Sequence, residues 1–196
     1  MKTFRAFGPT IGKGKLSRKF INTINTKIEK SILSKRNDYS AKLASQIKNE
    51  IQVSNSFIKK NLSKELIRNI KAYLKKSEID NIKEIKIINL WVVKQLKNEY
   101  NPVHYHEGQL SGVGYLKIPK NMNINKMVKN KKIKTNGTID FINGQKNFLS
   151  QSMYNLNPKL GDLVIFPNYL MHTAYPFNVD GERRSFSFNV KILFKK

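Results

Sequence analysis

Apolar residues in the first part of the chain recur at helical spacing. Between residues 16 and 33 they return every three or four positions, which predicts an amphipathic helix. Residues 43–51 continue this spacing and predict a second helix, and Ser63 is a suitable N-cap for a third that ends near Lys76. Lysines fill the outer positions of these helices, so we expect solvated faces there. The glycine-rich residues 1–14 predict an irregular segment or a short edge strand.

From residue 82 onwards the pattern changes to short segments rich in β-branched and aromatic residues. The last of these alternates Arg183, Ser185 and Ser187 with Arg184 and Phe186, so each set belongs to one face of a strand. The predicted strands are residues 82–93, a strand end at 104–106, 110–118, a short hairpin near Asn136-Gly137, 160–166, 172–175 and 183–194.

Short strands without interleaved helices predict an antiparallel barrel or sandwich. The expected fold class is therefore mainly β with N-terminal helices. We expect a helical region, residues 1–80, packed on a β core formed by residues 81–196. The lysine-rich residues 119–134 predict an exposed loop.

Composition limits the cellular context and the partners. The chain has 196 residues, which suits one domain, and no cysteine, which excludes thiolate metal sites and disulfides. No run approaches the roughly 20 apolar residues of a membrane span, so we expect a cytoplasmic protein with no membrane partner. The formal charge is +24, but only six of the 37 basic residues are arginine, the residue preferred for phosphate and base contacts. We therefore expect only weak, non-specific binding to polyanions.

All three histidines lie in two short, motif-like segments: His104 and His106 in one, and His172 in the other. Side chains two residues apart on a strand point to the same face, roughly 6–7 Å apart. His104 and His106 can therefore converge on one ion, while Tyr105 and Glu107 point away unless a bulge intervenes. Neutral imidazole is a good ligand for iron, zinc, copper and nickel, so this cluster predicts a metal site.

The segments around these histidines resemble two motifs of a family of iron(II)/2-oxoglutarate-dependent oxygenases found in marine bacteria and their phages. The first is Asn101-Pro102-Val103-His104-Tyr105-His106, then Leu110-Ser111-Gly112-Val113, Tyr115-Leu116 and Pro119. The second is Gly161-Asp162-Leu163-Val164-Ile165-Phe166-Pro167, His172, Pro176-Phe177, Arg183, Ser185 and Ser187-Phe188-Asn189.

The resemblance implies a double-stranded β-helix (jelly-roll) barrel that binds Fe(II) and 2-oxoglutarate in its mouth. It implies that His104 and His172 are metal ligands. It further implies that Arg183 pairs with the distal carboxylate of 2-oxoglutarate and that Ser185 adds a hydrogen bond, a role that Tyr115 can share. A planar guanidinium suits this task because it matches a carboxylate bidentately.

One departure from the wider superfamily concerns the third metal ligand. The usual facial triad has a carboxylate two residues after the first histidine, and that position is His106 here. Either three histidines bind the metal, or Glu107 reaches in through a bulge, or one histidine only lies near the metal. We take His106 as the ligand, and a neutral ligand changes the charge and redox tuning of the iron.

The leading hypothesis is thus an oxygenase that hydroxylates a small-molecule or peptidyl substrate that the sequence does not identify. One alternative is a cupin-like metal-binding protein without an oxo-acid cosubstrate, and another is a basic nucleic-acid-binding protein. Arg183 separates the first two hypotheses, because a cupin does not need a carboxylate-binding arginine at that place. DNA affinity that depends on salt and follows the lysines would favour the third hypothesis, the nucleic-acid-binding protein.

Overall fold

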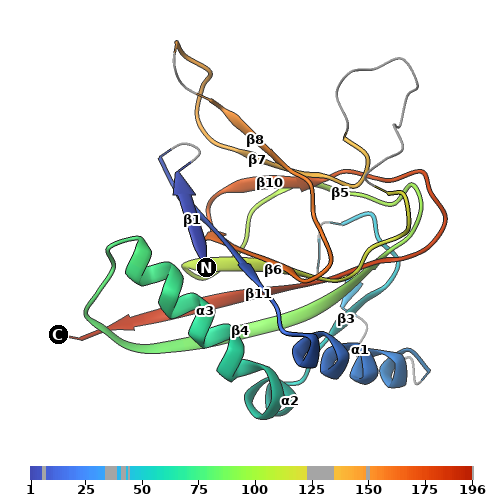
Figure 1. The fold of residues 1–196 in the computed structure, drawn as a ribbon, viewed down its shortest axis with the longest axis horizontal. Coiled ribbons are helices and arrows are strands. Elements are labelled where there is room, and N and C mark those ends of the chain that lie inside the picture. The colour runs from blue at the N-terminus through green and yellow to red at the C-terminus, as the bar shows by residue number, and fades with distance from the viewer. Residues whose placement is uncertain are drawn as a thin grey trace.

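The computed structural model describes residues 1–5, 8–33, 39–40, 43, 45–122, 135–148 and 151–195. It contains two antiparallel sheets and a helical layer (Figure 1). The helical elements are α1 (Arg18–Leu33), α2 (Asn55–Phe57), a π-helical turn (Ile58–Leu62) and α3 (Ser63–Lys76). The strands are β1 (Lys2–Arg5), β2 (Thr10–Lys15), β3 (Glu50–Gln52), β4 (Ile82–Gln95), β5 (Asn101–His104), β6 (Leu110–Lys117), β7 (Ile139–Ile142), β8 (Met153–Leu156), β9 (Asp162–Pro167), β10 (Met171–Ala174) and β11 (Arg183–Phe194).

The two sheets are unequal in size. The larger has the order β1-β2-β9-β6-β11-β4-β3, and the smaller has the order β5-β10-β7-β8. Figure 1 shows the smaller sheet on one side of the larger sheet and the helices on the other. The large sheet is therefore the middle of three layers, and its inner face looks toward the small sheet.

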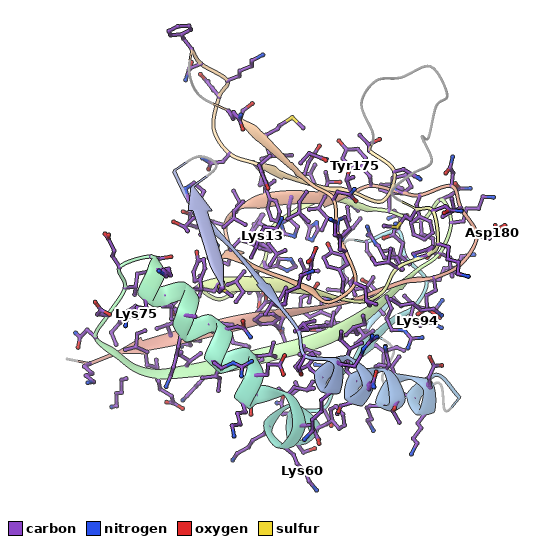
Figure 2. The ribbon with its side chains drawn as sticks, viewed as in Figure 1. Lys13, Lys60, Lys75, Lys94, Tyr175 and Asp180 are labelled. Atoms are coloured by element: carbon purple, nitrogen blue, oxygen red, sulfur yellow. The ribbon has the colours of Figure 1, made fainter. Side chains whose placement is uncertain are left out.

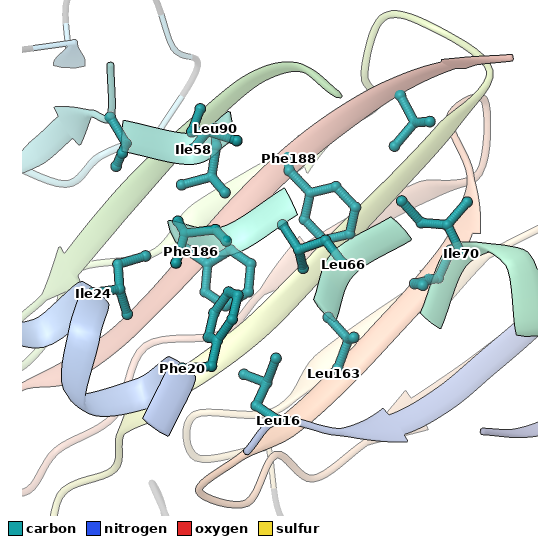
Figure 3. Packing of buried hydrophobic residues seen from close by; sticks show 14 of the residues in the cluster. Leu16, Phe20, Ile24, Ile58, Leu66, Ile70, Leu90, Leu163, Phe186 and Phe188 are labelled. Atoms are coloured by element: carbon teal, nitrogen blue, oxygen red, sulfur yellow. The ribbon is translucent and has the colours of Figure 1, made fainter. Parts of the chain in front are cut away.

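The helical layer is held by an apolar core against the outer face of the large sheet. Phe186 and Phe188 of β11 are fully buried there among apolar side chains of α1 and α3 (Figure 3). Gly112 and Gly114 on the neighbouring strand β6 make room for these rings, because a Cβ at either position would overlap one of them. Burial of a phenylalanine side chain contributes about 1.5–3 kcal/mol, so this pair anchors the helices to the strand that carries Arg183.

A second core fills the space between the sheets. It consists of Ile11, Tyr115, Ile139, Phe141, Leu156, Val164, Phe166 and Leu170. β11 thus has one face in each core, with Phe186 and Phe188 toward the helices and Arg183, Ser185 and Ser187 toward the small sheet. The predicted alternation of this strand is confirmed.

Most of the predicted elements are confirmed, including the first and third helices and the mainly β class with N-terminal helices. The third helix is longer than predicted, because helical backbone begins at Asn55, and Ser63 is therefore not its N-cap. The opening residues form β1 at the edge of the large sheet and β2 beside β9. Residues 1–80 thus contribute strands as well as helices to the fold. No helix in the described part of the chain is long and apolar enough to cross a membrane.

The predicted second helix is wrong. Residues 50–52 form β3, which pairs with β4 at the edge of the large sheet. The physical reason is that Ile51 packs on the helix-side core while Glu50 faces the other way, which is an alternation of period two. The helical spacing of Leu43, Ile47 and Ile51 arises because these residues join two different apolar clusters.

The predicted hairpin near Asn136-Gly137 is also wrong. β7 pairs with β8, which lies after it in the chain, and with β10. Asn136 instead donates a hydrogen bond from Nδ2 to the carbonyl oxygen of Met122, and Gly137 has a φ of +67°. Most of the loop predicted at residues 119–134 lies outside the described residues.

Candidate active site

Two of the three histidines face each other across a pair of strands. His104 on β5 and His172 on β10 are register partners in the small sheet. Their ring centroids are 4.2 Å apart, and both rings lie within 5.0 Å of the ring of His106. The nearest nitrogens of the three residues all lie within 4.8 Å of one another. Sheet pairing therefore brings together residues that are 68 positions apart in the sequence.

Hydrogen bonds orient two of these rings. His104 donates from Nδ1 to the carbonyl oxygen of Pro102 over 2.7 Å, and His172 donates from Nδ1 to that of Leu170 over 2.9 Å. A carbonyl oxygen only accepts, so each Nδ1 carries the hydrogen and each Nε2 presents a lone pair. Metal-ligating histidines have this arrangement, in which the second nitrogen is fixed by a carbonyl or carboxylate.

His106 lies just beyond the end of β5 and is held through its backbone. Its N–H donates to the carbonyl oxygen of Asn168 over 3.1 Å, and the Asn168 side chain donates back to the carbonyl oxygen of His106 over 3.0 Å. Its ring packs near Trp91, with the centroids 5.6 Å apart, and near Phe166. His106 is thereby turned inward, with its Nε2 3.1 Å from that of His172.

Burial favours the neutral form of all three imidazoles. It lowers the pKa of His104 and, together with the neighbouring His104, lowers the pKa of His106 to about 3. The pKa of His172 is also well below its ordinary value, first because of burial and then because of the other two histidines. Neutral imidazole is the form that binds metals.

The three nitrogens fit a single metal ion. Imidazole nitrogens bind ions such as zinc at about 2.0–2.1 Å, and two of them at right angles around one ion are then roughly 3 Å apart, close to the spacing of His106 and His172. Within the described part of the chain, this is the one group of three or more histidine, aspartate or glutamate side chains with such spacing. Glu107 is exposed and outside the group, so the structure turns His106, and not Glu107, toward the other two histidines.

Arg183 is buried beside these histidines without an acidic partner. It is 3% exposed, and its Nη1 donates to the carbonyl oxygen of Gly137 while its Nη2 donates to Oε1 of Gln95. Its Nε has no hydrogen-bond partner, and neither has the hydroxyl of Tyr115, which is 1% exposed. Burial lowers the pKa of Arg183 and raises the pKa of Tyr115. A buried cation without a counter-charge is costly unless a ligand supplies one.

A cavity of about 40 Å³ joins Arg183 to the histidines. Its lining includes Tyr115 and Ser185, the two other residues that the family resemblance assigned to 2-oxoglutarate, as well as His104, His106 and His172. All six predicted site residues therefore meet around one space. The unpartnered Nε of Arg183 and hydroxyl of Tyr115 make this space suitable for the carboxylate of an oxo-acid.

Arg184 has a different environment on the opposite face of β11. Its guanidinium pairs with Glu182 over 2.6 Å and with Glu29 of α1 over 2.7 Å, and also donates to Asn25. The pKa of Arg184 is raised, because these carboxylates outweigh the effect of burial. Arg184 ties α1 to the sheet, whereas Arg183, its neighbour in sequence, faces the cavity.

A larger cavity of about 300 Å³ adjoins the smaller one at His104 and His106, which line both. It lies between β3 at the edge of the large sheet and β5 at the edge of the small sheet. Several residues that line it were not predicted from the sequence, among them Tyr39, Glu50 and Asn89, and neither was Gln95 as the partner of Arg183. The polar–apolar alternation of Glu50, Ile51 and Gln52 was a signal for β3, the strand that carries Glu50. Nothing in the sequence singles out Gln95.

The comparisons with known proteins agree with this geometry. No curated protein matches the chain. Solved structures with a similar fold include a prolyl-4-hydroxylase from Pseudomonas putida, 10% identical, with a TM-score of 0.58 over 95% of this chain and 93% of that one. A viral collagen prolyl hydroxylase from Paramecium Bursaria Chlorella virus-1, in complex with 2-oxoglutarate, is 14% identical, with a TM-score of 0.59 over 95% and 98%.

HygX from Streptomyces hygroscopicus, with nickel and 2-oxoglutarate bound, is 9% identical, with a TM-score of 0.55 over 95% of this chain and 83% of that one. At these identities the similarity shows the fold alone, which is the jelly roll expected from the sequence. The match to a family model described as "Putative 2OG-Fe(II) oxygenase" covers residues 89–189, more than half of the chain and all six predicted site residues. The chain belongs to this family of oxygenases, which use Fe(II) and 2-oxoglutarate.

Proposed function

We propose that the protein hydroxylates a substrate, still to be identified, at a three-histidine iron centre. His104, His106 and His172 would hold Fe(II) through their Nε2 atoms, two of which are oriented by the carbonyl oxygens of Pro102 and Leu170. Bound iron would supply the redox chemistry that couples decarboxylation of 2-oxoglutarate by dioxygen to hydroxylation of the substrate.

The chain's own residues bind and orient the reactants. Arg183 takes the distal carboxylate of 2-oxoglutarate, and Tyr115 and Ser185 donate hydrogen bonds to it. Phe166 and Val113 provide an apolar wall beside these polar groups and exclude water from them. The cavity of about 300 Å³ receives the substrate, because it is lined by His104 and His106 and adjoins the cosubstrate cavity.

The single observation that carries this proposal is the buried guanidinium of Arg183. It makes no ion pair with any described residue, its Nε lacks a partner, and it faces the cavity that it shares with the three histidines. A metal-binding protein without an oxo-acid would have no use for such a cation, which disfavours the cupin-like alternative.

The test is an anaerobic titration of the protein with Fe(II) and then with 2-oxoglutarate, followed by a succinate assay in air. We expect one Fe(II) per chain, one 2-oxoglutarate per Fe(II), and slow succinate formation even without substrate. Replacement of His172 with Ala should abolish stoichiometric Fe(II) binding and leave the circular dichroism spectrum unchanged. Unchanged metal content in this variant, or failure of the wild type to bind 2-oxoglutarate, would refute the proposal.

A further inference from the structure

Charge is unevenly distributed along the inner face of the large sheet. On β11 this face runs from Arg183 through Ser185 and Ser187 to Asn189, a distance of about 20 Å at roughly 3.3 Å per residue. At one end lies the buried guanidinium of Arg183 beside Gln95. At the other end Asn189 pairs in register with Asn89 of β4, and its Oδ1 accepts a hydrogen bond from Ser111. The positive charge on this face of β11 thus lies at the end that borders the cosubstrate cavity, whereas amides lie at the end that borders the substrate cavity.

The substrate cavity has one apolar wall. Leu43, Trp91 and Val93 form this wall, and the ring of Tyr39 meets that of Trp91 at a centroid distance of 6.1 Å. Trp91 also contacts the ring of His106, so the wall begins at the proposed metal site and extends outward. A short alkyl chain packed along this wall would be stabilised by removal of its methylenes from water.

The groups that face this wall offer hydrogen-bond acceptors. Oδ1 of Asn89 is buried and has no partner among the described residues, and Glu107 adds a carboxylate at the rim. Glu50 also lines the cavity, and its carboxylate accepts a hydrogen bond from the Ser45 hydroxyl. No described residue in the lining is lysine or arginine, although these make up 37 of the 196 residues of the chain.

The lysines and arginines in the described part of the chain lie outside this lining. Lys60 and Lys75 are exposed on the outer side of the helical layer, and Figure 2 shows both extending away from the sheets. The described lining of the substrate cavity thus holds the carboxylates of Glu50 and Glu107 and no lysine or arginine, on an otherwise strongly basic protein. Such a site disfavours phosphates and carboxylates, and it suits a cationic group.

We propose that the substrate carries an alkylammonium group, as in the side chain of a basic amino acid or in a diamine. This rests on the proposed function, since it assigns the cavity next to the metal site to the substrate. An ammonium has three donors and no acceptor, which matches Oδ1 of Asn89 and the carboxylate of Glu107. The aromatic rings of Trp91 and Tyr39 favour a nearby cation, and the alkyl stem covers their apolar surface.

The first test compares three probes of equal length on protein loaded anaerobically with Fe(II) and 2-oxoglutarate: 1-butylammonium, butan-1-ol and butanoate. Saturating 2-oxoglutarate keeps butanoate away from Arg183. Calorimetric titration should show butylammonium binding about ten-fold or more tightly than either other probe, as expected for hydrogen bonds to a charged group. Butanoate or butanol binding as tightly as butylammonium would overturn the inference.

The second test uses matched variants. Glu107→Gln should reduce the preference for butylammonium over butanol by about two- to five-fold, the range for an exposed ion pair. Glu84→Gln is the control, because it removes an exposed carboxylate of β4 that lies outside the cavity. An equal effect of both variants would mean that only the net charge of the protein matters, and would refute a role for Glu107.

The third test separates the two sources of an ammonium group. N-acetyl-lysine N-methylamide represents a lysine within a peptide, and 1,4-diaminobutane represents a free amine. If one of them binds more tightly than its uncharged counterpart, the inference is supported and the source of the ammonium group is identified. If neither binds more tightly than its uncharged counterpart, the inference is contradicted. If the protein binds neither Fe(II) nor 2-oxoglutarate, the proposed function fails as well, whereas a loaded protein that prefers butanoate contradicts the inference alone.

Discussion

Replacement of Arg183 with methionine tests the cosubstrate site most directly, because it removes the charge and keeps much of the side-chain volume. The guanidinium would make charged hydrogen bonds to 2-oxoglutarate, and such bonds contribute about 1.5–3 kcal/mol. Loss of this amount raises the dissociation constant by roughly ten-fold or more, since each 1.4 kcal/mol is about a factor of ten. Fe(II) affinity should barely change, because Arg183 faces the cosubstrate cavity and its guanidinium donates hydrogen bonds to Gly137 and Gln95, not to the histidines.

The same variant makes a second prediction about stability. In the ligand-free protein Arg183 is a buried cation without an acidic partner. Removal of the guanidinium eliminates that desolvation cost, which offsets the loss of its two hydrogen bonds. The free energy of unfolding measured in urea should therefore change little. At a 2-oxoglutarate concentration 100 times the wild-type dissociation constant, the ligand should stabilise the wild type by about 2.7 kcal/mol and a ten-fold weaker variant by about 1.4 kcal/mol.

Arg184→Met is the matched control from the opposite face of the same strand. It breaks the ion pairs with Glu182 and Glu29, so it should lower the free energy of unfolding by roughly 1–3 kcal/mol. The dissociation constant of 2-oxoglutarate should stay at the wild-type value. If 2-oxoglutarate binds less tightly to Arg184→Met than to Arg183→Met, the assignment of Arg183 to the cosubstrate is wrong.

Three further predictions concern the histidines and the surface charge. His106→Ala should lose stoichiometric Fe(II) in calorimetry and Glu107→Gln should retain it, and the reverse pattern would show that the carboxylate binds the metal. In metal-free protein the unfolded imidazoles take up protons near pH 6.5, whereas the folded ones do so at lower pH, the pKa of His106 being about 3. The unfolded state therefore binds more protons as the pH falls below about 6.5, and stability should fall by up to about 1.4 kcal/mol per pH unit for each histidine. Urea unfolding at several pH values measures how steeply the free energy of unfolding changes with pH. His106→Asn should make this dependence shallower, and an unchanged dependence would contradict the burial of His106. Duplex DNA should bind weakly and dissociate steeply with salt, and sequence-specific binding that survives roughly 200 mM salt would restore a nucleic-acid function.

The sequence singled out the residues that the structure brings together at the candidate site, but not the residues that surround the substrate cavity. His104, His106, His172 and Arg183 stand out because their residue types are scarce or strongly functional in their motifs, and alternation alone separates Arg183 from Arg184. The residues around the substrate cavity were not found, because they come from strand edges that become neighbours only when the two sheets pack.

The region of residues 43–51 shows the limit most clearly. Its apolar spacing fits a helix, yet pairing with β4 places residues 50–52 in a strand and turns Glu50 toward the cavity. Local periodicity cannot weigh the hydrogen bonds that a distant edge strand offers, so tertiary pairing overrides it. The hairpin expected near Asn136-Gly137 failed for the same reason, because β7 has its partners in β8 and β10.

The sequence by itself determined the mainly β class, the strand face that carries Arg183 and Ser185, and the choice of histidines that can bind a metal. These follow from side-chain chemistry and from the two-residue period of a strand, which are local properties, whereas the 2-oxoglutarate roles of Arg183, Ser185 and Tyr115 came from the resemblance of the motifs to a family. Only the tertiary structure decided that His106 and not Glu107 turns inward, because the backbone contacts of His106 with Asn168 fix that turn. It also decided that Arg183 is left without an acidic partner, because the burial of a charge depends on every segment that packs around it.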